Sequence, residues 1–273
     1  MNKENYLISL FQNNFIGDDG AIVGNAIYSK DLFCEDIHFK REWMSLEQIA
    51  YKAMLVNISD AIVMNAKPLY ALLGLKLPAN ISHHDMKELS KGFLKACDEY
   101  GITIIGGDTV SGDKIDISIT LISHSSSPIT RKGLVVGDLV AYTGSLGLVK
   151  KDLEKLFQGH KIDKNSKFIK PKLKAEFFYE VAPFVKVALD ISDGLSKDLS
   201  RLSEINSVGF EFLQKLSSDE LCSGEEYEIL FGFDKKDKDS ILKIASYHDI
   251  KINIFAKAIE GSYKNICGEN HFG

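Results

Sequence analysis

The chain has 273 residues, of which 45% are hydrophobic and 26% are charged; these values are ordinary for a globular protein and leave room for one large domain or two modest ones. The net charge is −5 and no lysine- and arginine-rich stripe is present, which argues against nucleic acid as the main partner. The segment 1–16 mixes polar with apolar residues and predicts neither a signal peptide nor a membrane span.

Four cysteines are widely scattered along the chain and form no C-x-x-C pair. We interpret them as small buried hydrophobic residues rather than as a zinc site or a disulfide framework. This interpretation suits a reducing compartment, so the sequence predicts a cytoplasmic protein. The cysteines are Cys34, Cys97, Cys222 and Cys267.

The first predicted elements are a hairpin and a helix. Residues 21–33 have apolar residues on both sides of a Gly-Asn turn, which is typical of a hairpin. A capping box at 45–48 opens a helix, and this helix must end before Pro68. The apolar run 69–77 then predicts a buried strand.

A second helix and two further strands follow. Ser82 opens an amphipathic helix, and Gly101 lies just past its end. Residues 102–105 form a short predicted strand that leads into the Gly-Gly-Asp sequence at 106–108. Apolar and polar residues alternate over 115–121, which predicts a half-buried strand.

The turn-rich segment 128–137 is the best candidate for a domain boundary. After it, strands and helices continue to alternate, so the class is mixed α and β with two predicted domains. The later strands are predicted at 139–142, 187–191, 208–212, 227–233 and 252–259, and the later helices after Gly147 to near Gly159, at 195–205 and at 238–247.

Five short segments place aspartate or glutamate beside glycine, serine or threonine at the ends of these elements. Several carboxylates that converge on one place repel one another and cannot all stay ionised. Mg²⁺ resolves this conflict because it takes oxygen ligands and favours sites that substrate phosphates complete. The segments, 17–20, 57–60, 106–109, 190–194 and 223–226, therefore predict a magnesium-dependent enzyme of phosphate chemistry.

Each segment also has a purely structural explanation. The Gly-Asp-Asp-Gly sequence and the Gly-Gly-Asp sequence are both compatible with tight turns. Ser192 or Asp193 can cap the helix that follows them, which leaves Asp190 unexplained. A buried Asp60 is either a metal ligand or half of an ion pair, and Glu225 is compatible with a solvated charge. Arg131 is either an ordinary loop charge or a phosphate ligand.

In their order and spacing, these segments together resemble the thiamine-monophosphate kinase family, within the superfamily of aminoimidazole ribonucleotide synthetase-like ATP-binding enzymes. The resemblance rests on eight motifs in order and covers nearly the whole chain. They are Gly17-Asp18-Asp19, Ser29-Lys30-Asp31 with His38-Phe39, Ala53 to Asp60, Gly106 to Thr109, Thr130-Arg131 with Gly137-Asp138, Ala188 to Leu195, Ser223 to Glu228, and the final His271-Phe272-Gly273.

The resemblance implies an α/β (α+β) fold of two domains. Residues 1–130 would form an amino-terminal metal- and ATP-binding domain whose mixed sheet is the core of a homodimer. Residues 131–273 would form a carboxy-terminal domain that completes the active site. The implied reaction is direct in-line transfer of the γ-phosphoryl group of ATP to thiamine monophosphate, assisted by several Mg²⁺ ions. It gives thiamine diphosphate, in the last step of its biosynthesis, and needs no general base, because the attacking phosphate oxygen is already ionised.

The resemblance also implies roles for individual residues. The metal ligands would be Asp19, Ser29, Lys30, Asp31, Asp60, Asp108, Asp190 and Asp193, and Lys30 keeps this role only if the residue at its position binds through its backbone carbonyl. Contacts to ATP would come from Gly107, Asp108, Arg131 and Ser192. Contacts to thiamine monophosphate would come from His38, Glu225 and Phe272.

Two departures from the family pattern keep alternatives open. Lys30 replaces a threonine, and Glu269 stands where the family often has an aromatic residue. These features favour a non-catalytic relative that binds nucleotide or thiamine phosphate. A second alternative is another ATP-dependent enzyme of the superfamily, although no cysteine precedes Cys34 as a selenide-using enzyme would require.

Overall fold

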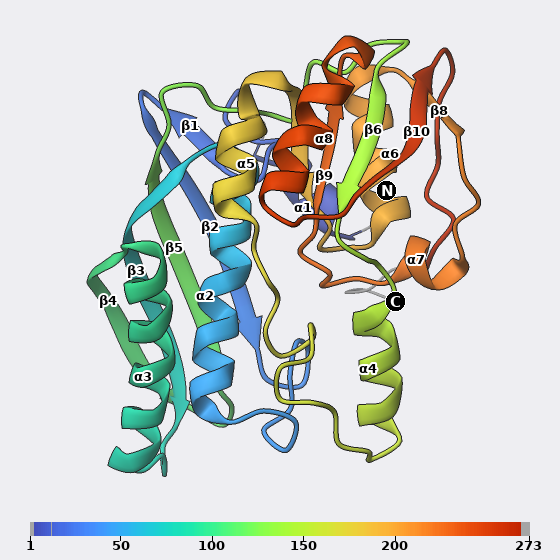
Figure 1. Ribbon diagram of the computed structural model, residues 1–273. Coiled ribbons are helices and arrows are strands. Elements are labelled where there is room, and N and C mark those ends of the chain that lie inside the picture. Colours follow the sequence, from blue (N-terminus) through green and yellow to red (C-terminus); the bar gives the residue numbers. More distant parts are fainter. Residues whose placement is uncertain (1–2, 12, 269–273) are drawn as a thin grey trace.

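A computed structural model describes residues 3–11 and 13–268 of the chain. The amino-terminal half contains one five-stranded sheet and three helices (Figure 1). Its elements are α1 (Lys3–Ser9), β1 (Ala21–Val23), β2 (Ala26–Cys34), α2 (Leu46–Val63), β3 (Lys67–Pro78), α3 (His83–Tyr100), β4 (Thr103–Gly112) and β5 (Asp116–His124).

The strand order of this first sheet is β1-β2-β5-β3-β4, and every neighbouring pair is antiparallel except β3 and β4. The exception follows from the connection, since α3 carries the chain back from the end of β3 to the start of β4. Helices α2 and α3 pack against each other, and α2 contacts β2, β3 and β5 on one face of the sheet.

The carboxy-terminal half contains a second five-stranded sheet with the order β7-β9-β6-β10-β8. All of its neighbouring strands are antiparallel. Its elements are β6 (Leu139–Thr143), α4 (Leu148–Phe157), α5 (Ala175–Val181), the 3₁₀ turn η1 (Ala182–Phe184), β7 (Val185–Asp190), α6 (Leu195–Asn206), β8 (Gly209–Phe212), α7 (Ser218–Cys222), β9 (Ile229–Phe233), the 3₁₀ turn η2 (Lys235–Asp237), α8 (Lys238–Tyr247) and β10 (Ile252–Ile259).

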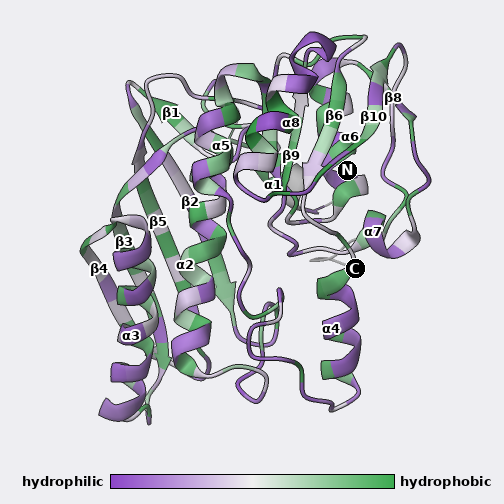
Figure 2. Cartoon of the chain, in the orientation of Figure 1, coloured by the Kyte–Doolittle hydropathy of each residue, from purple (hydrophilic) through white to green (hydrophobic). Residues whose placement is uncertain are grey.

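Helix α2 joins the two halves, because it contacts the first sheet on one side and both β7 and α5 on the other. Fifteen of its 18 residues are buried, which is the pattern of a helix enclosed on all sides. One core cluster accordingly includes residues from both halves, while a second lies within the carboxy-terminal half. The outer helix α3, by contrast, is largely hydrophilic on its outer side (Figure 2).

The predicted helix ends are confirmed. Ser45 and Ser82 each accept a hydrogen bond from the third residue of their helices, and both capping boxes are complete. Gly101 ends α3 in the left-handed conformation, with φ +69°. The predicted strands are all present, whereas the short helices α1, α5 and α7 were not predicted. The predicted domain boundary between residues 130 and 131 lies between the two sheets and stays a prediction.

The structure differs from the sequence interpretation at residues 106–108. These residues do not form a turn after a short strand; they continue β4 in parallel pairing with β3. Gly107 is required there by space, because a Cβ atom at this position would lie 1.9 Å from the carbonyl oxygen of Leu73. The paired glycines therefore let two strand backbones approach, which is a structural role that the sequence analysis did not consider.

The interpretation of all four cysteines as separate apolar residues is wrong for two of them. Cys222 and Cys267 form a disulfide, with their Cα atoms 5.5 Å apart, while Cys34 and Cys97 are free. The partners are 45 residues apart in sequence. They meet because the segment after β10 returns along α6, where Ile266 donates a hydrogen bond to the Ser196 hydroxyl.

Among the described helices, none is long and apolar enough to cross a membrane.

Candidate metal and phosphate site

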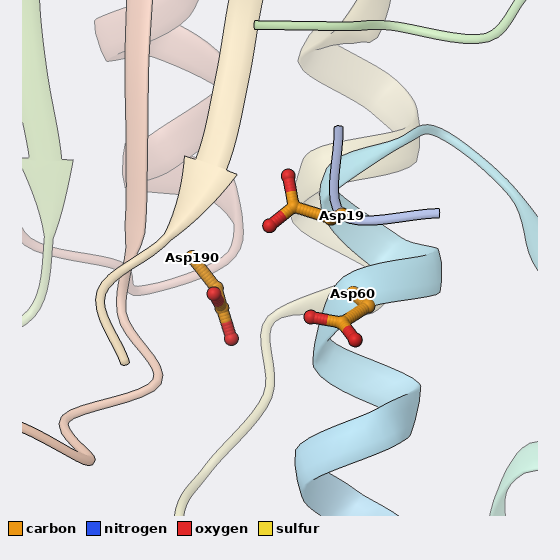
Figure 3. Close-up of side chains that lie close together, drawn as sticks. All are labelled: Asp19, Asp60 and Asp190. Carbon is orange, nitrogen blue, oxygen red and sulfur yellow. The ribbon is translucent and has the colours of Figure 1, made fainter. Parts of the chain in front are cut away.

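Three aspartates from distant parts of the chain meet where the two halves join (Figure 3). Asp19 comes from the loop before β1, Asp60 from the last turn of α2, and Asp190 from the end of β7. One carboxylate oxygen of each lies within 4.8 Å of one oxygen of the other two. The meeting point exists because α2 packs against both β2 and β7.

Asp31 is the fourth member of this cluster. It lies on the inward face of β2, and its carboxyl group is hydrogen-bonded to that of Asp60. Burial and the charge of Asp19 raise the pKa of Asp31 to about 6. Burial first, and then the neighbouring carboxylates, raise the pKa values of Asp60 and Asp190 well above their usual range. The four carboxylates, which we call the aspartate cluster, are therefore in strong mutual repulsion.

Two serines add oxygen atoms around the cluster. Ser59 donates a hydrogen bond of 2.8 Å to Asp190 Oδ2 and so orients that carboxylate. Ser29 lies two residues before Asp31 on the same face of β2, and its buried Oγ atom has no hydrogen-bond partner among the described residues. An unpartnered buried hydroxyl and four crowded carboxylates form a set of hard oxygen donors, which fits Mg²⁺.

Basic side chains border the cluster. The guanidinium group of Arg131 lies on Asp19, with Nη2 2.6 Å from Oδ1, and the Arg131 backbone N–H donates to Asp18. Burial would lower the pKa of Arg131, but the charge of Asp19 and the hydrogen bond to it raise it, so this side chain stays cationic. Arg201 pairs with both Asp193 and Asp198. The site thus combines an acidic centre with a basic rim.

The aspartate cluster, Arg131 and Arg201 line a cavity of about 1080 Å³, a volume that is large enough for a nucleotide. Asp193 lines it too, and Lys197 joins Arg201 in pairing with this carboxylate. Burial would raise the pKa of Asp193, but Arg201 and Lys197 lower it below its usual value. The predicted residues on this cavity are Asp19, Lys30, Asp31, Asp60, Arg131, Asp190, Ser192 and Asp193.

The side chain of Lys30 does not belong to the cluster. Its ammonium group donates to Ser118 Oγ and Thr120 Oγ1 on β5, so it lies on the opposite face of the sheet from Asp31. The replacement of threonine by lysine therefore places no cation among the aspartates. A role for Lys30 through its carbonyl oxygen stays a prediction.

Gly107 and Asp108 are not brought to the cluster within one chain. The strand register aligns Leu32, Ser118, Gly74 and Asp108 in one row across the sheet. Leu32 and Asp108 are exposed there, on the face away from α2. The sheet thus separates Asp108 from Asp31 and Asp60.

The predicted substrate residues His38 and Glu225 do not line this cavity. The ring of half-buried His38 stacks on Phe33, and its Nδ1 accepts a hydrogen bond from the Cys34 backbone. Glu225 forms an ion pair of 2.6 Å with Lys52, a buried residue of α2 that the sequence analysis missed. A lysine in the middle of an apolar helix was the available signal, because a buried ammonium group needs a partner. Phe272 lies outside the described residues.

Known proteins that resemble this chain identify its family. Residues 17–124 match the family model described as AIR synthase related protein, N-terminal domain. The thiamine-monophosphate kinase of Nitrosopumilus maritimus is 32% identical over 74% of this chain and 71% of its own length. That of Pyrococcus horikoshii is 30% identical over 86% of this chain and 82% of its own length.

A solved structure of AaThiL, in complex with AMPPCP and TMP, has the same fold. It superposes with a TM-score of 0.85 at 24% identity and covers 96% of this chain and 91% of its own. The resemblance inferred from eight motifs is thereby confirmed, as is the mixed two-domain fold. The chain belongs to the thiamine-monophosphate kinase family.

Proposed function

We propose that the protein transfers the γ-phosphoryl group of ATP to thiamine monophosphate and so forms thiamine diphosphate. The observation that carries this proposal is the aspartate cluster at the edge of a cavity that Arg131 and Arg201 also line. The curated relatives bear the name of this activity, and AaThiL was solved with an ATP analogue and TMP.

The aspartate cluster would hold Mg²⁺ through Asp19, Asp31, Asp60 and Asp190, with Ser29 supplying a further oxygen. Bound Mg²⁺ would offset the negative charge of the two phosphate groups and of the group in transfer. The protein's own contribution is to place donor and acceptor phosphates in line in one cavity, and no proton needs to be removed from the attacking oxygen.

Several residues are suited to the ATP phosphates. Arg131 neutralises Asp19 in the described structure, and a guanidinium group in this place can also bind phosphate oxygens. Ser192 lies on the cavity wall just before α6, a 12-residue helix whose amino-terminal end favours anions. The assignment of Asp193 as a ligand of a further ion stays a proposal, as do the contacts of His38, Glu225 and Phe272 to thiamine monophosphate.

We also propose that the active protein is a homodimer in which Gly107 and Asp108 belong to the partner's site. Asp108 lies on the open face of the first sheet, beside exposed apolar residues such as Leu32 and Val110, and Gly107 precedes it in β4. A second copy that covers this face would bury the exposed apolar side chains. A two-fold axis would then supply each site with Gly107 and Asp108 from β4 of the partner.

Mixing two inactive variants tests the shared site. Asp60→Asn and Asp108→Asn should each be inactive alone, while a mixture refolded together should recover about a quarter of wild-type activity, because half of the dimers contain one intact site. No recovery in a mixture that forms dimers would place Asp108 outside the partner's site.

The reaction itself is tested by incubating the purified protein with ATP, MgCl₂ and thiamine monophosphate and separating the products by chromatography. We expect thiamine diphosphate and ADP, and none of either product with EDTA. Unphosphorylated thiamine as acceptor and AMP as donor are the negative controls. Binding of thiamine monophosphate without turnover would favour the non-catalytic alternative, and turnover of a different acceptor would favour another enzyme of the superfamily. A cytoplasmic location stays a prediction, and the Cys222–Cys267 disulfide does not support the reduced cysteines on which that prediction rested.

A further inference from the structure

Lys52 is enclosed completely near the middle of α2. Its side chain has no exposed surface, and its Nζ atom lies 2.6 Å from Glu225 Oε2. The same atom lies 3.9 Å from the ring centre of Phe168 and 5.6 Å from that of Phe33. The ammonium group therefore occupies an aromatic slot with one carboxylate as its ion-pair partner among the described residues.

Burying a charged ammonium group in this way costs free energy of folding. Burial lowers the pKa of Lys52, and the ion pair with Glu225 opposes this effect. Packing alone would be served as well by an apolar side chain, because replacing buried ion pairs by apolar residues is often neutral or stabilising. The charge of Lys52 thus needs an explanation outside the stability of the core, and its position against Glu225 offers one.

The loop that carries Glu225 has an unusual backbone. Glu225 and Tyr227 both have positive φ values, +54° and +48°. The Glu225 N–H donates to the Ser192 carbonyl and the Tyr227 N–H to that of Ile191, so the loop lies against the end of β7 beside the aspartate cluster. The side chain of Glu225 is 21% exposed, and one of its oxygens is the atom that contacts Lys52.

We propose that Lys52 is a positioning residue for the acceptor substrate: it fixes one oxygen of Glu225 so that the other faces the rings of thiamine monophosphate, a cationic thiazolium and an aminopyrimidine. This inference rests on the proposed function. The ammonium group also offsets the charge of Glu225, which together with Asp31, Asp60 and Asp190 adds to the negative charge around buried Tyr227. The acceptor then meets an oriented carboxylate instead of a mobile one.

The test is Lys52→Met, in which an apolar chain of similar length fills the aromatic slot. We expect the KM for thiamine monophosphate to rise at least about tenfold, as expected when one partner of a buried charge pair is lost, while the KM for ATP stays within about twofold. Lys52→Gln, which can still donate a hydrogen bond to Glu225, should recover part of the loss.

Two further variants separate positioning from packing. Phe168→Leu removes the aromatic face and keeps the ion pair, so it should lower the melting temperature and leave the KM for thiamine monophosphate unchanged. Because Lys52 acts through Glu225, the double variant Lys52→Met with Glu225→Gln should have the same KM as Glu225→Gln alone. Additive effects, or equal rises in the KM of both substrates, would overturn the proposal.

Hydrogen exchange gives a measure that does not depend on turnover. In Lys52→Met the amides of Glu225 and Tyr227 should exchange faster, with no such change in Phe168→Leu. Unchanged exchange at both amides would show that Lys52 does not order this loop. If the wild-type protein does not act on thiamine monophosphate, the proposed function fails, and the exchange result alone still decides whether Lys52 positions Glu225.

Discussion

At the scale of single residues, Asp60 is both a proposed metal ligand and a source of instability in the metal-free protein. Its carboxyl group lies among three others, and burial and their charges raise its pKa. In the absence of a cation this crowding opposes folding, because the ionised forms repel one another in a poorly solvated place. A bound divalent ion would turn the same crowding into affinity.

Asp60→Asn should therefore have opposite effects on activity and on stability. We expect Mg²⁺-dependent formation of thiamine diphosphate to fall at least about a hundredfold, roughly 3 kcal/mol in the barrier, because one ligand is lost. The melting temperature in EDTA should rise, because one repelling carboxylate has been removed. Turnover assays and thermal denaturation measure the two effects.

An exposed aspartate is the matched control. Asp239→Asn, in the first turn of α8, should change neither measurement appreciably. Full activity in Asp60→Asn would refute its assignment as a ligand, and a lower melting temperature in EDTA would show that its carboxylate stabilises the metal-free protein.

At the scale of elements, Gly107 shows how a motif with a predicted ligand role also has a packing role. Gly106 and Gly107 lie side by side in β4, with φ values of +159° and +153°. A Cβ atom on Gly106 would lie 3.3 Å from the nearest atom, a methyl group of Leu72, whereas on Gly107 it would overlap the Leu73 backbone. The two glycines thus differ in the space available to them.

Gly107→Ala should destabilise the protein far more than Gly106→Ala. We expect Gly107→Ala to cost at least about 3 kcal/mol, the upper end for overpacking, or to prevent folding, because β3 and β4 must separate to admit the methyl group. In Gly106→Ala a side chain moves instead of a backbone. Urea denaturation of both variants gives the comparison, and equal costs would contradict this account of the pairing.

The disulfide joins two other elements, the end of α7 and the segment after β10. Closing a loop of 45 residues restricts the unfolded chain, and the chain-entropy model gives about 4 kcal/mol of stabilisation. Reduction with dithiothreitol should therefore lower the free energy of unfolding by up to this amount. Cys222→Ser should show the lower value with and without reductant.

Cys97→Ser is the matched control for this experiment, because Cys97 is buried and free. Its stability should still fall on reduction, as that of the wild type does. A wild-type protein whose urea transition does not move on reduction would contradict a stabilising role of the Cys222–Cys267 bond.

At the scale of the whole molecule, the aspartate cluster makes stability depend on pH. Folding raises the pKa of Asp31 from 3.8 to about 6 and raises those of Asp60 and Asp190 further. The folded protein therefore binds more protons than the unfolded chain above about pH 4, and its free energy of unfolding falls as the pH rises through this window. Asp31 alone accounts for about 3 kcal/mol of this decrease in the free energy of unfolding.

Metal-free protein should thus be more stable at about pH 5 than at about pH 8 with respect to these groups, and MgCl₂ should reduce or reverse the difference, because the cation binds the ionised carboxylates. Urea denaturation in EDTA and in MgCl₂ at both pH values gives the four free energies of unfolding that this comparison needs. Parallel pH dependences with and without MgCl₂ would show that the cluster does not bind this ion.

Local patterns predicted much of this protein. The capping boxes at Ser45 and Ser82 and the left-handed Gly101 act within a few residues, so the sequence alone placed these helix ends correctly. Most of the acidic motifs likewise lie at element ends, although residues 106–109 lie inside β4, and the order of the motifs was enough to identify the family. The short helices α5 and α7 were not predicted, because segments of five to seven residues carry little periodicity.

The tertiary structure alone decided which of these residues meet. Asp19, Asp60 and Asp190 converge because α2 packs between two sheets, and no local rule fixes that packing. The same packing joins Lys52 to Glu225 across 173 positions of sequence and Cys222 to Cys267 across 45. It also places Asp108 on the far face of a sheet, because side chains alternate along a strand and the register of the whole sheet sets which face each one takes.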